Sequence, residues 1–294
     1  MNAFVMISML LIFALGMFLL WREGLLKNTA HLVFAFLFMA GAVVIRYFLL
    51  DYESGDYLSF LAPWTEFFRE HGGFKALGLS VGNYNLPYLY FLALFSYIDI
   101  SELYLIKLLS IVFDVLLAWA CMKLCSLFTK GRLRLIVCFF AVLLFPTVVL
   151  NGAYWAQCDS IYTFFAVLSL YLALSDKPVG AMVSITASFA FKLQAVFVMP
   201  VFFVLLVAKK IKFKHLFIFP AAYLVMMLPA VIAGRPLWDT LTLYFSQAGT
   251  VGDAMNYNVP SLTSMFRWGE NTEMWSTLLV IAAFVFMFIV FAVA

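Results

Sequence analysis

The stretch LYLIKLLSIVFDVLLAWACMKLCSLF, residues 103–128, decides the fold class because it is long and apolar enough to cross a lipid bilayer as one helix. It ends at the basic connector KGRLR (130–134), which the positive-inside bias places in the cytoplasm. The whole chain shares this composition: 66% of its 294 residues are hydrophobic and only 11% are charged, whereas a soluble domain is roughly half apolar and a quarter charged. The sequence therefore predicts an all-α, polytopic membrane protein that forms a single transmembrane domain over residues 1–294, with about eight to ten membrane segments.

Outward from this span, further apolar runs alternate with connectors that differ in charge. We expect membrane spans at 1–21, 31–50, 135–150, 161–175, 216–233 and 277–294. The connector 22–30 is basic and belongs in the cytoplasm, so the long stretch 51–102 emerges on the outer face. Within it, residues 57–70 carry an apolar face typical of a helix at the membrane surface, and 86–98 is short enough to be interfacial or re-entrant. The last run ends without a polar flank, which predicts that the natural protein continues beyond Ala294.

Residues 179–208 pose a conflict, because they are long enough for one crossing although the basic segment KKIKFKH (209–215) also belongs inside. A broken hairpin resolves it. One short helix rises to about Phe191, the chain turns near Lys192 and Gln194, and a second helix descends. Broken helices are found in membranes where they line a cavity or are buried in protein.

Three loops reach the same outer face in this topology, and they hold nearly all the carboxylates outside the spans: 51–102, 151–160 and 234–276. The net charge of +3 comes from short basic connectors on the other face and indicates no nucleic-acid partner. The four cysteines make no metal-ligand group, and phosphate-loop, dinucleotide-binding and zinc-protease motifs are absent from the sequence. We therefore expect any chemistry on the extracytoplasmic side.

Asp56 is the first candidate for that chemistry, because it follows a span at the lipid–water boundary. Partial removal from water makes a carboxylate a better base. Asp56 also precedes an apolar helical run, where it would serve as a helix N-cap, and the residues alone leave both roles open. Its neighbours Asp51 and Glu53 form a D-x-E pair, which either binds a divalent cation through oxygen ligands or remains solvated loop charge.

Lys192 is the second candidate, because it lies between apolar residues inside the predicted membrane region. An intramembrane lysine is costly and is a functional-site hypothesis by default. Its ammonium would hold a lipid-linked phosphate as a point charge, or it would pair with Asp114, which also lies inside a span. Lys107 is seven residues before Asp114 and shares its helix face, so these two charges offer a further structural alternative.

Polar and aromatic residues of the outer loops complete the candidate set. The candidates for contact with a diphosphate or sugar are Arg235, Arg267, Tyr257 and Asn258. The aromatic residues that would stack on sugar rings, or simply anchor at the interface, are Trp64, Tyr84, Tyr88 and Trp155. Gln157 and Asp159 stand in the short loop, where hydrogen bonding to loop backbone is the plain alternative to a binding role.

The order of five motifs resembles the GT-C glycosyltransferases, multi-span enzymes that use polyprenyl- or dolichyl-phosphate sugars. The motifs are SGDYLSFLAPW (54–64), YNLPYLY (84–90), LIKLLSIVFDVLLA (105–118), YWAQCDSIYTFFAVLSL (154–170) and FKLQAVFVMPVFF (191–203). The chain looks most like the dolichyl-phosphate-glucose-dependent glucosyltransferases and the bacterial relatives of the GPI-anchor mannosyltransferases. The likeness runs over about residues 40–265.

The resemblance implies roles for the matching residues. In the family an acidic residue of the first outer loop is the catalytic base, which here is Asp56. The second outer motif lies beside the donor and here contributes Gln157 and Asp159, while the F-K-L turn lies by the carrier phosphate and contributes Lys192, followed by Gln194. The chain departs from the family in having two spans before the catalytic loop instead of one, and D-Y-E only approximates the metal motif of some relatives.

These expectations combine into an inverting glycosyltransferase. It would move a hexose, with mannose or glucose favoured by the resemblance, from a polyprenyl- or dolichyl-phosphate carrier to a hydroxyl of a glycan or lipid acceptor. The expected place is the bacterial plasma membrane, or the endoplasmic-reticulum membrane if the chain is eukaryotic. Two alternatives stay open: a lipid-linked-sugar transporter or flippase, which broken helices and buried charges also suit, and an inactive GT-C-like scaffold. A divalent cation is the one cofactor that the sequence raises.

Overall fold

The computed structural model describes residues 3–247 and 272–293, and in these ranges every regular element is a helix. The first part contains α1 (Ala3–Arg22), α2 (Thr29–Tyr47), the π-helical turn η1 (Tyr57–Leu61), α3 (Ala62–Glu70), the 3-10 turn η2 (Gly73–Gly78) and α4 (Leu86–Phe95). The middle contains α5 (Glu102–Cys125), α6 (Arg132–Leu143), α7 (Pro146–Val149), the π-helical turn η3 (Leu150–Tyr154), α8 (Asp159–Leu174) and α9 (Pro178–Phe191). The last part contains the 3-10 turn η4 (Leu193–Val198), α10 (Met199–Val207), α11 (Phe213–Leu216), α12 (Ile218–Ile232), α13 (Leu237–Gln247) and α14 (Thr272–Val293).

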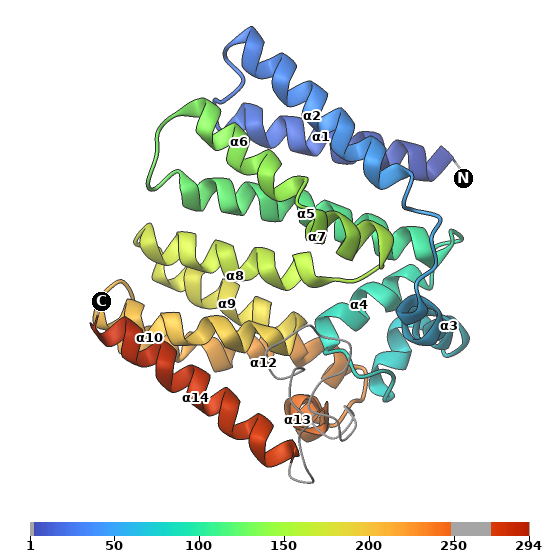
Figure 1. Ribbon diagram of the computed structural model, residues 1–294. Coiled ribbons are helices and arrows are strands. Elements are labelled where there is room, and N and C mark those ends of the chain that lie inside the picture. The colour runs from blue at the N-terminus through green and yellow to red at the C-terminus, as the bar shows by residue number, and fades with distance from the viewer. Residues whose placement is uncertain (1–2, 248–271, 294) are drawn as a thin grey trace.

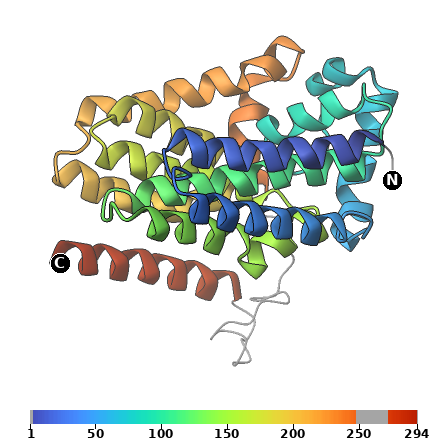
Figure 2. The ribbon, with the colours of Figure 1, turned by 90° about the horizontal axis from the view of Figure 1, so that it is seen from above.

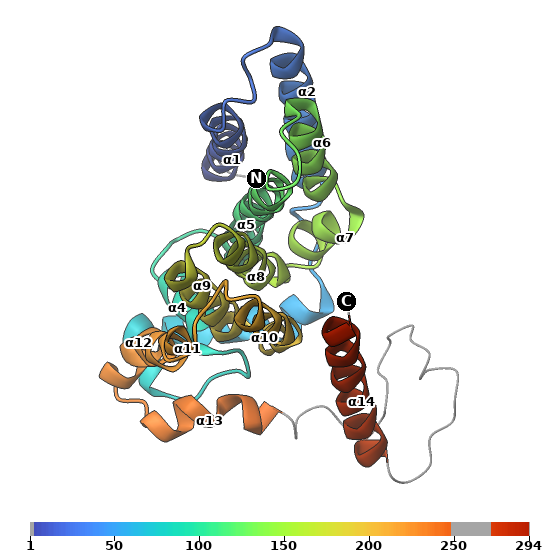
Figure 3. The same cartoon turned by 90° about the vertical axis from the view of Figure 1, so that its left-hand side faces the viewer.

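The long helices lie side by side in a stack with α5 and α8 near its middle (Figure 1). Seen along their axes, α1, α2 and α6 group on one side of α5, and α9, α10 and α12 lie beyond α8 (Figure 3). One apolar core joins α1, α2, α5 and α6 through buried side chains such as Leu20, Met39 and Phe139. A second core joins α3, α4, α5 and α12 through side chains such as Phe68 and Leu89. Helix α5 is thus packed on both sides.

Helix α14 runs along the outside of the stack when the molecule is seen from above (Figure 2). Its Phe284 stacks on Phe197 of η4, with ring centroids 6.1 Å apart. Most of its described side chains are exposed, as expected for a helix whose neighbour on that side is lipid.

Among the described residues, four helical units are long and apolar enough to cross a membrane: α1, α2, α5 and the unit Phe213–Ile232, which joins α11 and α12. A fifth results if α6 is counted with the segment Pro146–Tyr154, to which it is bent by 48°. Proline explains the bend, because its ring and missing N–H interrupt a helix. The remaining apolar helices, among them α4, α8 and α9, are shorter. The predicted eight to ten segments therefore correspond, in the described chain, to four or five full spans together with shorter apolar helices.

The chain breaks at Lys192 as the hairpin hypothesis predicts. Helix α9 ends at Phe191, Lys192 adopts an extended backbone, and η4 and α10 follow. The far ends of the two arms meet again, because Lys210 after α10 donates to Asp176 before α9 at 2.9 Å. The break is what brings the Lys192 ammonium to the loops at the opposite end.

A buried ion pair between α2 and α5 overturns one predicted pairing. Asp114 accepts hydrogen bonds from Nε and Nη2 of Arg46 at 3.0 and 2.9 Å, and both side chains are at most 1% exposed. The remaining carboxylate oxygen accepts from Ser160 of α8, and Arg46 also donates to the carbonyl of Leu143 at 2.7 Å. The interpretation of Lys192 as the partner of Asp114 is wrong, because Arg46 already satisfies that carboxylate.

Lys107 is also bound to backbone rather than to a carboxylate. Its ammonium donates to the carbonyls of Leu49, Leu50 and Tyr52 at 2.9, 2.9 and 2.6 Å. These carbonyls follow the C-terminus of α2, where unpaired acceptors favour a cation. Lys107 and Asp114 share a helix but bind different partners, and both hold α2 against α5.

The two ends of the stack differ in charge. The connectors after α1, α5, α8 and α10 lie at the left-hand end in Figure 1, and they carry basic residues such as Lys130, Lys209 and Lys210. The opposite end holds α3, α4 and the loops around residues 48–56 and 151–158. That second end carries the candidate site.

Candidate functional site

A small pocket at this second end contains Asp56. Its volume is about 130 Å³, and its lining consists of Asp56, Phe60, Leu61, Trp64, Asn83, Tyr84 and Gln157. Three segments therefore form its wall: residues 56–64, which run through η1 into α3, the loop before α4 and the loop before α8. The first two belong to the predicted outer loop 51–102 and the third to the predicted loop 151–160.

The Asp56 carboxylate binds across the pocket instead of capping its own helix. Its Oδ2 accepts from the indole Nε1 of Trp155 at 3.0 Å and from Nε2 of Gln157 at 2.8 Å. Asp56 makes no side-chain cap bond, whereas Oγ of Ser54 accepts from the Tyr57 amide at 3.1 Å. The N-cap interpretation of Asp56 is therefore wrong, since Ser54 serves as the cap.

Both bonds to Asp56 have a chemical consequence. Because both bonds fall on Oδ2, they orient the carboxylate and leave Oδ1 as the oxygen available to a ligand in the pocket. The arrangement suits acceptance of a proton from a bound hydroxyl.

Gln157 connects Asp56 to Tyr84. Its amide nitrogen donates to Asp56, and its Oε1 accepts from the Tyr84 hydroxyl at 2.9 Å. Its backbone is fixed as well, because its carbonyl accepts from Ser110 of α5 at 2.8 Å. The preceding residue, Ala156, is buried with φ of 61°, a left-handed conformation that costs free energy for a residue with a Cβ. The surrounding contacts stabilise this strained turn, which orients the Gln157 side chain toward Asp56.

Tyr84 also faces the Lys192 ammonium, which lies 5.7 Å from the centroid of its ring. Burial raises the pKa of Tyr84 well above its ordinary value, with nearby acidic groups adding to the effect. The hydroxyl thus remains a donor to Gln157 at any physiological pH. Tyr84 therefore links the two predicted candidates of the site. Its hydroxyl reaches Asp56 through Gln157, and its ring faces the Lys192 ammonium.

Lys192 is paired with Asp159, the first residue of α8. The other oxygen of Asp159 accepts from Nδ2 of Asn151 at 2.7 Å. The side chains of Lys192 and Asp159 are 17% and 35% exposed, so this pair is open to solvent, unlike the Arg46–Asp114 pair. A cation that is held by one partly exposed carboxylate can exchange that partner for a ligand anion.

The structure does not bring every predicted residue into the pocket. Trp64 lines it and contacts Tyr84 with ring centroids 5.3 Å apart, and Trp155 is half exposed at its edge. Tyr88 is 1% exposed, which excludes it from stacking on a sugar. Gln194 is exposed in the turn that follows Lys192.

Arg235 and the metal candidates lie apart from the pocket lining. Arg235 is buried after α12 and donates to the Leu79 carbonyl at 3.4 Å. Asp51 accepts from Tyr104 at 2.8 Å, and the described residues contain no group of three His, Cys, Asp or Glu side chains that could hold a metal ion. Glu53 is exposed. Tyr257, Asn258 and Arg267 lie outside the described residues.

Sequence reasoning missed two contributors. Asn151 holds Asp159 through two hydrogen bonds. Its Nδ2 donates to the Asp159 carboxylate, and its Oδ1 accepts from the Asp159 backbone N–H at 3.3 Å. Asn83 lines the pocket beside Tyr84. Asn83 stands in GNYN and Asn151 in NGAYW, short segments between longer apolar helices, and an amide side chain at such a place is the signal that could have identified them.

Cys158 also lies in this loop, but it is not a nucleophile. Its side chain is 2% exposed, and burial raises the pKa of its thiol to about 12. A thiol with that pKa is protonated at neutral pH and therefore unreactive.

Comparison of the chain with known protein families, with curated proteins and with solved structures finds no match. The assignment of a function therefore depends on the geometry and on the motif resemblance.

Proposed function

We propose that the protein is an inverting glycosyltransferase of the GT-C type, which transfers a hexose from a polyprenyl-phosphate carrier to a hydroxyl acceptor on the extracytoplasmic face of a membrane. The observation that carries this proposal is the connection of Asp56, through Gln157 and Tyr84, to the neighbourhood of Lys192. A carboxylate that can take a proton and an ammonium that can hold a phosphate are the two groups that such a transfer needs.

The proposed reaction is a single displacement. The acceptor O–H gives its proton to Oδ1 of Asp56 while its oxygen bonds to the anomeric carbon of the sugar. The bond between that carbon and the carrier phosphate breaks, and the phosphate leaves with the electron pair. The transition state is oxocarbenium-like, as in glycoside hydrolysis, and one displacement inverts the anomeric centre.

Lys192 would stabilise the departing phosphate. It is held by Asp159 in the structure, so binding of the donor requires that the phosphate replaces this carboxylate. Asn151 already donates a hydrogen bond to Asp159, and it would still bind that carboxylate after Lys192 has turned to the phosphate. Increased negative charge on the leaving phosphate then strengthens its contact with Lys192 as the reaction proceeds, which lowers the barrier.

The charge distribution supports the proposed orientation in the membrane. Basic connectors at one end of the stack favour the cytoplasm, which leaves the Asp56 pocket on the extracytoplasmic side. The transporter alternative draws on buried charges, but Arg46, Asp114 and Lys107 are all bonded to protein groups. They leave no buried charge in that region to bind a solute, which gives that alternative less support.

Substitution of Asp56 by Asn tests the proposal. The purified full chain in nanodiscs is offered a panel of polyprenyl-phosphate hexoses with lipid and glycan acceptors. The amide keeps the size of the side chain and its acceptor oxygen but cannot take a proton, so turnover should fall roughly 10²- to 10⁴-fold.

Glu53→Gln is the matched control, because it removes an exposed carboxylate of the same loop that does not line the pocket. It should leave turnover unchanged. Equal turnover in wild type and Asp56→Asn would exclude Asp56 as the base. Failure of the wild type to bind any of the donors would reject the transferase, whereas binding of a donor without sugar transfer would favour the transporter.

A further inference from the structure

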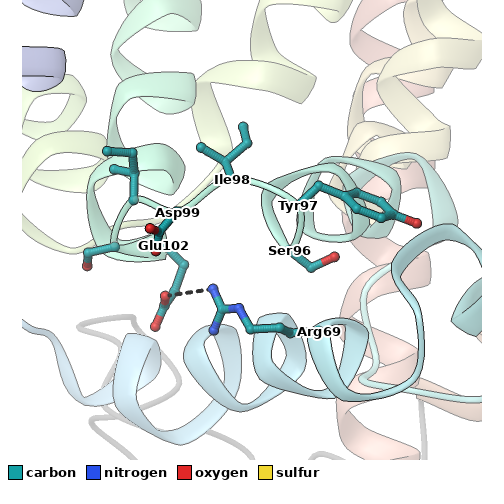
Figure 4. A pocket seen from close by; sticks show the side chains of 8 residues that line it. Arg69, Ser96, Tyr97, Ile98, Asp99 and Glu102 are labelled. Atoms are coloured by element: carbon teal, nitrogen blue, oxygen red, sulfur yellow. Dashed lines mark ion pairs between the residues drawn. The ribbon is translucent and has the colours of Figure 1, made fainter.

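A second, larger cleft lies between α3 and the connector that leads from α4 into α5. Its volume is about 570 Å³, and its polar lining comes from Arg69, Ser96, Asp99, Ser101 and Glu102. Figure 4 shows Arg69 reaching from α3 toward Glu102, and the closest atoms of the pair are 3.6 Å apart. The side chains of Arg69 and Glu102 are 39% and 21% exposed, so both remain accessible to a ligand.

The charges of this cleft are mixed. Arg69 is the one cation among the lining residues, and Asp99 and Glu102 supply two carboxylates. Glu66 also pairs with Arg69 from one turn earlier in α3. A purely anionic ligand would meet two or three carboxylates for one guanidinium. A ligand with both a phosphate and an ammonium group complements the cleft better, because each of its charges meets an opposite one.

An apolar groove adjoins the cleft. Its volume is about 420 Å³, and it lies between α1, α4 and α5, with Phe4, Leu11, Phe95, Leu105 and Val112 in its walls. From Leu105 to Val112 it follows α5 for roughly 10 Å, at 1.5 Å per residue. Its lining is almost entirely apolar, and Ser8 of α1 is the one polar side chain in it.

Ile98 joins the two cavities, because it lines both of them. Figure 4 shows its side chain turned away from Arg69, on the other side of the connector. The polar cleft and the apolar groove therefore meet at Ile98, and the groove follows α1 and α5, which are long enough to cross the membrane. A head with a phosphate and an ammonium, followed by an apolar tail, matches this order of surfaces.

We propose that this composite site binds one phospholipid with a primary-amine headgroup, of the phosphatidylethanolamine type. The phosphate accepts hydrogen bonds from Arg69, the ammonium donates to Asp99 and Glu102, and an acyl chain passes Ile98 and lies in the groove beside Ser8. A primary ammonium has three N–H donors for the carboxylates, whereas a quaternary choline headgroup has none.

The site also contacts the segment that carries Asp56. Glu102 accepts a hydrogen bond from the Tyr57 hydroxyl at 3.1 Å, and Tyr57 is the neighbour of Asp56. Burial and the adjacent Glu102 carboxylate raise the pKa of Tyr57, so the hydroxyl stays protonated and keeps this bond. A lipid bound at Glu102 thus stands next to the start of η1 without belonging to the Asp56 pocket.

Native mass spectrometry of the delipidated full chain tests the proposal directly. The probes are phosphatidylethanolamine, phosphatidylcholine and phosphatidylglycerol with identical acyl chains, titrated into detergent. Phosphatidylethanolamine should bind with a midpoint about tenfold lower than the other two, the effect of one charged hydrogen bond. Arg69→Gln should weaken it by a similar factor, and the double variant Asp99→Asn, Glu102→Gln should remove the preference over phosphatidylcholine.

Tail binding is tested separately with Ser8→Phe, which fills the groove from α1. Ile7→Phe is its control, because Ile7 is 57% exposed on the same helix and does not line the groove. For the headgroup, Arg132→Gln removes an exposed cation at the opposite end of the stack.

Stronger binding of phosphatidylethanolamine that is weakened by Arg69→Gln, and by Ser8→Phe where that variant folds, supports the site. Equal binding of the three lipids would overturn it, as would a preference for phosphatidylglycerol. So would equal losses in Arg69→Gln and Arg132→Gln, since the lipid would then be a general annular one. Sugar transfer does not enter this measurement, so its outcome is independent of the proposed enzymatic function.

Discussion

Two ion pairs, Arg46–Asp114 and Lys192–Asp159, join similar groups in very different surroundings. The first is at most 1% exposed and ties α2, α5, α6 and α8 together through Asp114, Ser160 and the Leu143 carbonyl. The second lies at a break between helices and is 17% and 35% exposed. A fully buried charge pair that is bonded to several protein groups serves the architecture, whereas a partly exposed pair at a backbone break can be exchanged.

The largest expected effect comes from breaking the buried pair. Asp114→Asn leaves the Arg46 guanidinium without its counter-ion, and removal of one partner of such a pair costs about 3–5 kcal/mol. The variant should lose much of its thermal stability in detergent, measured by fluorescence or by size-exclusion chromatography after heating.

The double variant Arg46→Met, Asp114→Leu provides the control for this prediction. It removes both charges and fills the space with apolar side chains, so it should recover a large part of the lost stability. If Asp114→Asn were as stable as the wild type, the buried pair would not hold the four helices, and its contrast with Lys192–Asp159 would fail.

Lys192→Met should have the opposite profile, with a small effect on stability and a large one on donor binding. A partly exposed pair contributes about 1 kcal/mol or less to folding, whereas loss of one charged hydrogen bond to the carrier phosphate weakens binding by about 1.5–3 kcal/mol, or roughly 10- to 150-fold. Donor affinity and melting temperature of the same preparation measure the two effects.

Asp159→Asn sharpens this test, because it removes the competitor for Lys192 and keeps an acceptor for Asn151. It should bind the donor at least as tightly as the wild type. A melting temperature that falls as far in Lys192→Met as in Asp114→Asn would contradict the distinction between the two pairs.

The helical architecture was accessible from the sequence, because a long apolar run has one solution in lipid. The break at Lys192 was predicted from the topology: the span before residue 179 returns to the cytoplasm and the basic connector 209–215 also belongs there, so residues 179–208 required an even number of passes. The partner of Lys192 was not predictable, since Asp114 and Asp159 are both acidic and only helix rotation and depth decide which of them faces the break.

Asp56 shows a similar limit. Ser54 and Asp56 both suit an N-cap, and the sequence does not reveal at which residue the helix begins. The bonds of Asp56 to Trp155 and Gln157 cross about a hundred residues of chain and depend on the left-handed turn at Ala156. An alanine gives no local sequence signal for a left-handed conformation. The turn, and the hydrogen bonds to Asp56 that depend on it, could therefore be found only from the structure.

The smallest effect is expected for a third ion pair, Lys210–Asp176, at the basic end. Its side chains are 36% and 77% exposed, and such surface pairs contribute little. Asp176 has φ of 57°, a left-handed conformation that asparagine tolerates well and alanine does not. Asp176→Asn should therefore change the stability by less than about 0.5 kcal/mol, whereas Asp176→Ala should cost about 1 kcal/mol through its backbone. A melting comparison of the two variants separates charge from conformation. A loss in Asp176→Asn as large as that in Asp176→Ala would mean that the exposed pair itself holds the hairpin closed, and exposure would then no longer distinguish structural ion pairs from exchangeable ones in this protein.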